Sequence, residues 1–81
     1  MMTVAQCRAA RALLDWTAQD LADRANIGVA TIRRYETGAA IAEVSHDAIE
    51  LALKKAGVVF ITAGSASATG GDGVRLVGMQ S

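Results

Sequence analysis

The stretch that decides the fold reads TAQDLADRANIGVATIRRYETG and spans residues 17–38. Its first residue, Thr17, and Asp20 fit a reciprocal helix cap, in which a hydroxyl and a carboxylate each accept a backbone N–H. We therefore expect a helix over 18–25. Asn26 follows, and asparagine tolerates the left-handed backbone conformation that ends many helices. The pattern predicts a short helix followed by a tight turn.

A second short helix is expected over 29–36. Helical spacing turns Ile32 and Tyr35 toward the interior and leaves Arg33 and Arg34 on the outer face. A glycine that follows ends the helix, because glycine adopts a left-handed backbone without a steric penalty. The whole stretch thus predicts two helices joined by a short turn.

Further helices are expected on either side of this stretch. Upstream, a helix over 3–14 has its threonine as N-cap. Downstream, Ser45 is expected as the N-cap of a fourth helix over 46–56, with Val44 packing on Ile49. The helical part of the chain therefore contains four predicted helices.

The chain changes character after residue 57. Two apolar and β-branched runs, residues 58–62 and 74–77, predict strands, and the small-residue segment between them predicts a mobile linker. A two-stranded hairpin alone is marginal in water, so it must pack on the helices or pair with a second copy. The expected fold class is mainly α: a four-helix unit, residues 1–57, and a C-terminal two-stranded β-hairpin extension, residues 58–81, in one compact domain overall.

The composition restricts the class of protein. A length of 81 residues allows at most one domain, and a chain that is 52% apolar but only 4% aromatic builds its core from aliphatic side chains. Eight basic and eight acidic residues give a formal net charge of zero, without the basic excess common in nucleic-acid binders. We find no apolar run near the ~20 residues that span a bilayer, no basic-then-apolar leader and no second cysteine. We expect a soluble protein of the reducing cytoplasm.

Residues that could carry catalysis or bind a metal are scarce. The histidine, His46, is expected on the surface, and the cysteine, Cys7, in the core, with redox sensing as the alternative. Two acidic pairs occur at short spacing, Asp20 with Asp23 and Glu43 with Asp47. Such pairs are more often solvated helix faces than acid–base catalysts. Residues 70–73 could hold a phosphate, but they do not join a strand to a helix, so a hairpin loop is the preferred interpretation. We expect no enzyme, no cofactor, no metal site and no small-molecule ligand.

Residues 14–38 resemble the phage-repressor-like helix-turn-helix family, also called the xenobiotic-response-element or XRE type. Residues 5–14, 56–58 and 73–76 look like a subgroup of small bacterial regulators that add a short β-hairpin. The resemblance implies core positions at Leu21, Ala22, Ile27 and Ile32, and a buried Trp16 before the second helix. It also implies that Arg11 and Glu36 form an ion pair that ties the first helix to the end of the recognition helix.

The resemblance also assigns the DNA-facing positions. They are Ala18, Gly28, Val29, Ala30, Arg33 and Arg34. At the first three, relatives often carry hydrogen-bonding side chains that this chain lacks. Arg34 is the better placed arginine to reach a guanine edge, while Val29 and Ala30 can touch a thymine methyl group. The residues expected to hold phosphates are Gln19, Thr31 and Thr37.

The function implied by the resemblance is a sequence-specific, DNA-binding transcriptional regulator. It would be a repressor that binds an inverted-repeat operator in double-stranded DNA as a homodimer, through the recognition helix 29–36. Because neutrality predicts a modest affinity for one copy, two copies are needed, with the hairpin 58–77 and the helix 46–56 as the expected interface. The alternative is a protein-interaction module that antagonises another regulator. Zero net charge and the bare positions Ala18, Gly28 and Val29 motivate that alternative.

Overall fold

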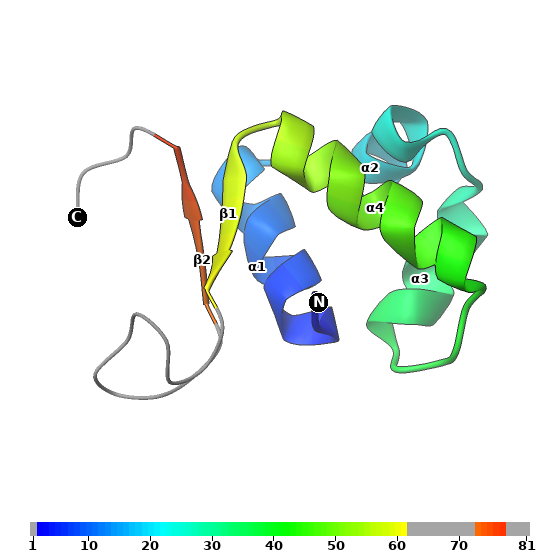
Figure 1. Cartoon of the computed structure of the whole chain (residues 1–81). Helices are drawn as coiled ribbons and strands as arrows, with labels where there is room; N and C mark the ends of the chain where they lie inside the picture. Colours follow the sequence, from blue (N-terminus) through cyan, green and yellow to red (C-terminus); the bar gives the residue numbers. More distant parts are fainter. Residues whose placement is uncertain (1, 62–72, 78–81) are drawn as a thin grey trace.

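The computed structural model describes residues 2–61 and 73–77, which form four helices and a two-stranded sheet (Figure 1). The helices are α1 (Val4–Leu14), α2 (Ala18–Ala25), α3 (Val29–Glu36) and α4 (Glu43–Lys55). The strands β1 (Val58–Ile61) and β2 (Gly73–Leu76) pair antiparallel. The predicted fold class, mainly helical with a C-terminal hairpin, is confirmed. Thr62 and residues 63–72 of the predicted linker over 63–73 lie outside the described residues. Gly73, predicted in the linker, is instead the first residue of β2, and Val77, predicted in the second strand, lies directly after it.

The first three helices have the bounds that the sequence predicts, and local signals explain the start of α1 and both ends of α2. The Thr17 hydroxyl accepts the N–H of Asp20 at 3.0 Å, and the Asp20 carboxylate accepts the N–H of Thr17 at 2.9 Å. Thr3 and Gln6 form the same kind of capping box at the start of α1. Asn26 adopts a left-handed φ of 58° and ends α2. Each of these signals acts within a few residues, so the sequence alone carries it.

The fourth helix differs from the prediction at its start. Helix α4 begins at Glu43, and the residue before it offers no side-chain cap. A carboxylate in the first turn favours this start, because it lies at the positive end of the helix macrodipole. Ser45 is therefore inside the helix rather than at its N-cap, and Val44 is 75% exposed, so it does not pack on Ile49. The predicted range 46–56 begins too late.

The core lies where the four helices meet. Its largest fully buried side chains are Cys7, Leu21, Ile32, Ile49 and Leu53. His46, predicted on the surface, is instead only 14% exposed at its side chain. Its ring meets the Tyr35 ring edge-on, with the centroids 5.4 Å apart, and its Nε2 lies 3.1 Å from the carbonyl oxygen of Met2. The surface prediction was wrong because His46 shares a helix face with the buried Ile49, one turn later.

A single buried glutamine connects the hairpin to the helices. The Gln6 side chain donates from Nε2 to the carbonyl oxygens of Ile61 at 3.1 Å and Gly73 at 3.0 Å, which are paired across the two strands. Its Oε1 accepts the N–H of Thr3 at 2.9 Å. The hairpin lies beside α1 at one end of the helical unit (Figure 1). One side chain thus caps α1 and holds both strands, a role that the sequence analysis did not find.

Replacing Gln6 should loosen the hairpin. The Gln6→Leu substitution keeps a side chain of similar length but leaves two strand carbonyls and one helix N–H without their partner. We expect the free energy of unfolding to fall by about 2 kcal/mol, measured by urea denaturation. The exposed Gln19 offers a matched control, since Gln19→Leu should change this free energy by less than about 0.5 kcal/mol. Equal losses in the two variants would contradict the clamp role of Gln6.

Candidate nucleic-acid interface

Backbone hydrogen bonds hold the turn between α2 and α3. The N–H of Ile27 donates to the carbonyl oxygen of Ala22 at 3.0 Å, beyond the last turn of α2. Gly28 then takes an extended conformation, and its carbonyl oxygen accepts the N–H of Thr31 at 3.0 Å. Helix α3 therefore starts immediately after the turn.

Helix α3 has one buried face and one exposed face. Ile32 is fully buried, and Tyr35 is 8% exposed and donates its hydroxyl to the carbonyl oxygen of Met2 at 3.2 Å. Burial, reinforced by nearby negative charge, raises the pKa of Tyr35 to about 12, so the hydroxyl stays protonated as a donor. Arg33 and Arg34 are exposed. The inner face anchors the helix, and the outer face presents two guanidinium groups.

The predicted DNA-contacting residues differ in their exposure and in whether their polar groups are hydrogen-bonded within the chain. Gln19, Gly28, Ala30, Arg33, Arg34 and Thr37 are exposed, whereas Ala18, Val29 and Thr31 are half-buried. Gln19 donates to Asp23 Oδ1 at 2.9 Å, and the Thr37 hydroxyl donates to the carbonyl oxygen of Arg34 at 2.8 Å. Both polar groups are thus engaged within the chain. The two arginines of α3 remain the strongest donors on this surface.

Gly28 stands at the N-cap of α3 without supplying a capping side chain. Its φ of −72° suits any residue, and an added Cβ would meet no atom within 4 Å. The fold therefore does not require glycine there, and a serine would fit. Gly38 differs, because its φ of +93° lies in the region that side chains oppose. Of these two glycines, only Gly38 is demanded by the backbone.

An ion pair connects α1 to the end of α3. Arg11 Nη2 lies 2.7 Å from Glu36 Oε1, and Arg11 Nε lies 2.8 Å from Glu36 Oε2, so the contact is bidentate. The two side chains are 22% and 11% exposed. Arg11 Nη1 also donates to the carbonyl oxygen of Trp16 at 3.0 Å. One guanidinium therefore connects α1, the end of α3 and the residues that precede α2.

The pair also sets the protonation of its neighbours. Burial by itself raises the pKa of the Glu36 carboxyl, but the hydrogen bond and the charge of Arg11 outweigh it, and the pKa is lowered. Cys7 Sγ lies 3.4 Å from Glu36 Oε2. Burial, followed by the charge of Glu36, raises the pKa of the Cys7 thiol to about 12. The thiol therefore stays protonated and acts as a small core residue.

Arg8 adds a positive charge that the sequence analysis did not assign to the site. An open groove of about 570 Å³ is lined by Arg8, Arg11, Arg33, Glu36 and Thr37. Arg8 is exposed and lies one helical turn before Arg11 on α1, so it reaches the same groove. The three-residue spacing between Arg8 and Arg11 was the sequence feature that could have placed Arg8 at this site. Because Glu36 is already paired with Arg11, the groove carries the uncompensated charge of Arg8 and Arg33.

Other kinds of site are not seen in the part of the chain that the structure describes. None of its helices has the length and hydropathy needed to cross a membrane. No group of three or more His, Cys, Asp or Glu side chains within residues 2–61 and 73–77 could hold a metal ion.

Acid should weaken the fold through Glu36. Because folding lowers the pKa of Glu36, its contribution is complete above the unfolded pKa, near 4.5, and is lost as pH falls through the folded value. We expect the free energy of unfolding, measured by urea denaturation, to fall between about pH 5 and 3. Glu36→Gln should cost about 3 kcal/mol at pH 7, because Arg11 loses its partner charge. The remaining fall with acid should then be smaller.

The exposed Glu43 supplies the control for this measurement. Glu43→Gln removes the same charge at the surface of α4 and should leave the acid profile close to that of the unchanged chain. Identical acid profiles for Glu36→Gln and the unchanged chain would show that the Arg11–Glu36 pair does not stabilise the fold.

The comparisons with known proteins agree with this geometry. A family described as helix-turn-helix matches residues 8–57, which is more than half of the chain and includes α1 to α4 apart from the first residues of α1. No curated protein matches the chain. The matched segment contains the Arg11–Glu36 pair, the turn between α2 and α3, and the two exposed arginines of α3. The chain belongs to the phage-repressor-like (XRE-type) helix-turn-helix family of DNA-binding regulators.

Proposed function

We propose that the protein is a cytoplasmic transcriptional repressor that binds an inverted-repeat operator as a homodimer, with α3 in the major groove. The observation that carries the proposal is the division of α3. Ile32 and Tyr35 hold its inner face in the core, and Arg33 and Arg34 occupy the exposed face. A helix anchored in this way can enter the major groove of DNA without rearrangement of the protein fold. Repression follows by occlusion of the promoter.

The two arginines have different tasks in this proposal. Arg34 reaches a guanine edge, where a guanidinium can donate two hydrogen bonds to O6 and N7. Arg33 and Arg8 line the same open groove on the protein surface. Both bind phosphates on one strand of the DNA. The exposed Ala30 and the half-buried Val29 contact thymine methyl groups. Specificity then depends on one arginine and on apolar contacts, since Gly28 adds no side chain.

Binding should depend on the two arginines and on salt. In a gel-shift titration with a duplex from the chain's own promoter region, Arg33→Ala with Arg34→Ala should weaken binding at least about tenfold. Raising the salt concentration should weaken the unchanged chain steeply, because phosphate contacts release counterions. The matched control, Arg24→Ala with Lys55→Ala, removes the same charge from exposed positions on α2 and α4 and should keep most of the affinity.

The same titration tests the alternative function. Ala18 and Val29 have apolar side chains and Gly28 has none, so these positions offer no side-chain hydrogen bond to DNA. This motivates the alternative of a helix-turn-helix module that antagonises another regulator instead of binding DNA. Such a module would show no binding even at low salt. That result would exclude the repressor proposal, whereas salt-sensitive binding that requires Arg33 and Arg34 would exclude the alternative.

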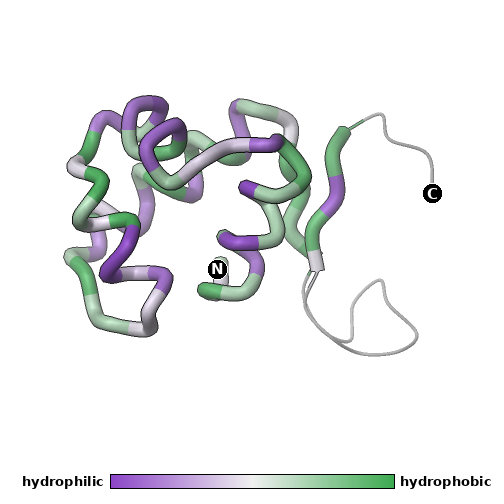
Figure 2. The backbone as a smooth tube through the Cα atoms, turned by 180° about the vertical axis from the view of Figure 1, so that it is seen from behind, coloured by the Kyte–Doolittle hydropathy of each residue, from purple (hydrophilic) through white to green (hydrophobic). Residues whose placement is uncertain are grey.

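For the homodimer, we assign residues 1–57 to DNA binding and the extension 58–81 to dimerisation. In both views of the fold, no other described element lies along the outer edge of β2 (Figures 1 and 2). An open edge of this kind can pair with a second copy. Val77, directly after β2, is 68% exposed, and its N–H continues the ladder to the carbonyl oxygen of Gly57 at 2.7 Å. This leaves a large apolar side chain at the end of the edge.

A charge at this edge should separate the two copies. We expect the unchanged chain to be a dimer by light scattering, and Val77→Glu to be a monomer with at least about tenfold weaker operator binding, because one half-site contact is lost. Val44, which is 75% exposed on α4, is the matched control. Val44→Glu should remain a dimer. If Val77→Glu also remains one, the interface lies elsewhere than at the end of the hairpin.

A further inference from the structure

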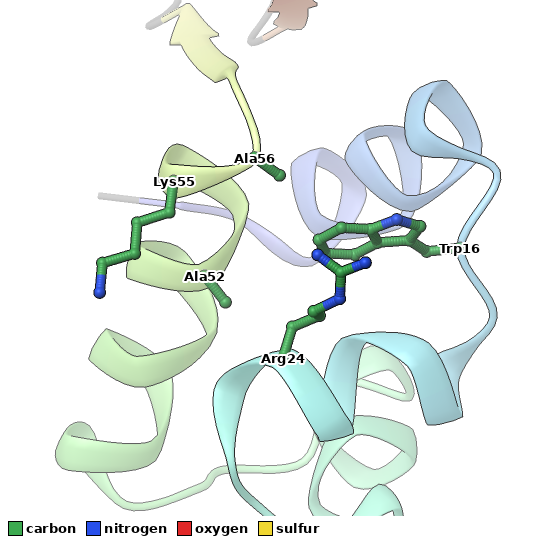
Figure 3. A pocket seen from close by; sticks show the side chains of 5 residues that line it. All are labelled: Trp16, Arg24, Ala52, Lys55 and Ala56. Atoms are coloured by element: carbon green, nitrogen blue, oxygen red, sulfur yellow. The ribbon is translucent and has the colours of Figure 1, made fainter.

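A groove between α2 and α4 has no part in the proposed DNA contacts. One face of α4 lines it with residues at helical spacing: Ala48, Leu51, Ala52, Lys55 and Ala56. Opposite them lie Arg24, Ala25 and Trp16. The groove consists of two hollows of about 180 Å³ each, which share Arg24, Ala52 and Lys55. Figure 3 shows the hollow beside Trp16. We call the whole surface the α2–α4 groove.

Arg24 is held in place over the face of Trp16. Its guanidinium carbon lies 4.8 Å from the ring centroid, and the group extends across the indole (Figure 3). A stacked guanidinium uses its flat face, so its N–H groups stay available at the edge for a carboxylate. Among residues 2–61 and 73–77, no carboxylate forms an ion pair with Arg24 or with Lys55. The groove therefore offers two cations, one of them already oriented.

Apolar side chains cover the floor of the groove. The methyl groups of Ala52 and Ala56 point into the space between α4 and Trp16 (Figure 3). Leu51 is 54% exposed at the other hollow, a large apolar side chain that this chain leaves in water. The groove follows α4 from residue 48 to 56, a length of about 12 Å at 1.5 Å per residue. Such a strip is long enough for a few residues of a second chain.

We propose that the α2–α4 groove binds an acidic peptide segment of a partner protein. Carboxylates of the segment pair with Arg24 and Lys55, and an apolar side chain between them packs on Leu51 and the alanines. The charge of the groove selects acidic residues, and the apolar floor selects a leucine-like neighbour. A peptide fits this alternation of cations and apolar surface, because one peptide supplies carboxylates and apolar side chains at adjacent positions.

Two other occupants fit the groove less well. Each hollow, about 180 Å³, is smaller than the ~300 Å³ at which sites for drug-sized ligands begin. DNA phosphates would meet the cations but would leave Leu51 exposed and the floor unfilled. Arg24 also follows Gln19 by five residues, which rotates it by roughly 140° around α2 from the predicted phosphate contact. The segment and DNA therefore occupy different faces of the protein, and the proposal does not depend on DNA binding.

The test is a titration of the full ¹⁵N-labelled chain with a short amidated peptide in which Glu and Leu alternate. The control peptide carries Gln at every Glu. Trp16 is the sole tryptophan, so its indole N–H signal reports on the groove directly. We expect the acidic peptide to shift this signal and the amides of Ala52 and Ala56, with an affinity that weakens as salt is added. The Gln peptide should leave these signals in place.

Three double variants separate charge recognition from damage to the fold. Arg24→Gln with Lys55→Gln should weaken the acidic peptide about fivefold to tenfold. Arg33→Gln with Arg34→Gln removes the same charge from the exposed face of α3 and should have little effect. Arg24→Glu with Lys55→Glu should instead prefer a peptide of alternating Lys and Leu. That reversal is a result that loss of packing cannot produce.

Four results would overturn the proposal. The first is equal binding of the Gln and Glu peptides, and the second is shifts confined to the groove of Arg8 and Arg33. The third is that inorganic phosphate or duplex DNA moves the Trp16 signal while the acidic peptide does not. The fourth is loss of dimerisation in the Arg24→Gln, Lys55→Gln variant, which would identify the α2–α4 groove as an interface between copies of this chain.

Discussion

The bidentate contact between Arg11 and Glu36 is the interaction on which the rest of the structure depends. Helix α3 has only eight residues, too few to be stable by itself in water. Its first turn is set by the bend after α2, and its last residue is held by a guanidinium from α1. The same guanidinium holds the backbone before α2 through the carbonyl oxygen of Trp16. Three segments of the helical unit are therefore positioned by one side chain, which donates hydrogen bonds from Nε, Nη1 and Nη2.

This arrangement explains how a chain with no net charge can present a basic surface. Arg11 is neutralised by Glu36, and Lys54 by Glu50 at 2.9 Å, so these charges serve the fold. The guanidinium groups of Arg33 and Arg34 are turned outward because Ile32 and Tyr35 take the inner positions. The charge of each face therefore depends on which side chains pair in the folded chain, not on composition. The zero total says little about any one face of the molecule.

Sequence reasoning worked best where the physical signal is local. The capping pairs Thr3 with Gln6 and Thr17 with Asp20 lie within one helical turn, and Asn26 marks its own left-handed conformation. Thr3, Thr17 with Asp20, and Asn26 were sufficient for the start of α1 and both ends of α2, and Gly38 marked the end of α3. The start of α4 has no such side-chain cap, so the prediction chose Ser45, a good capping residue that lies inside the helix. Serine is a favourable N-cap residue, but in the folded chain α4 already begins two residues before Ser45.

The sequence by itself determined the order of the elements, the family and the two faces of α3, because caps, helical periodicity and motif spacing are properties of neighbouring residues. Only the tertiary structure decided how Gln6 holds Ile61 and Gly73, since these partners are 55 and 67 residues away along the chain. The same holds for His46, whose burial depends on Tyr35 and Met2, and for Arg24, which stacks on Trp16 beside α4. Contacts between distant segments depend on how the helices pack, and no local pattern encodes that arrangement.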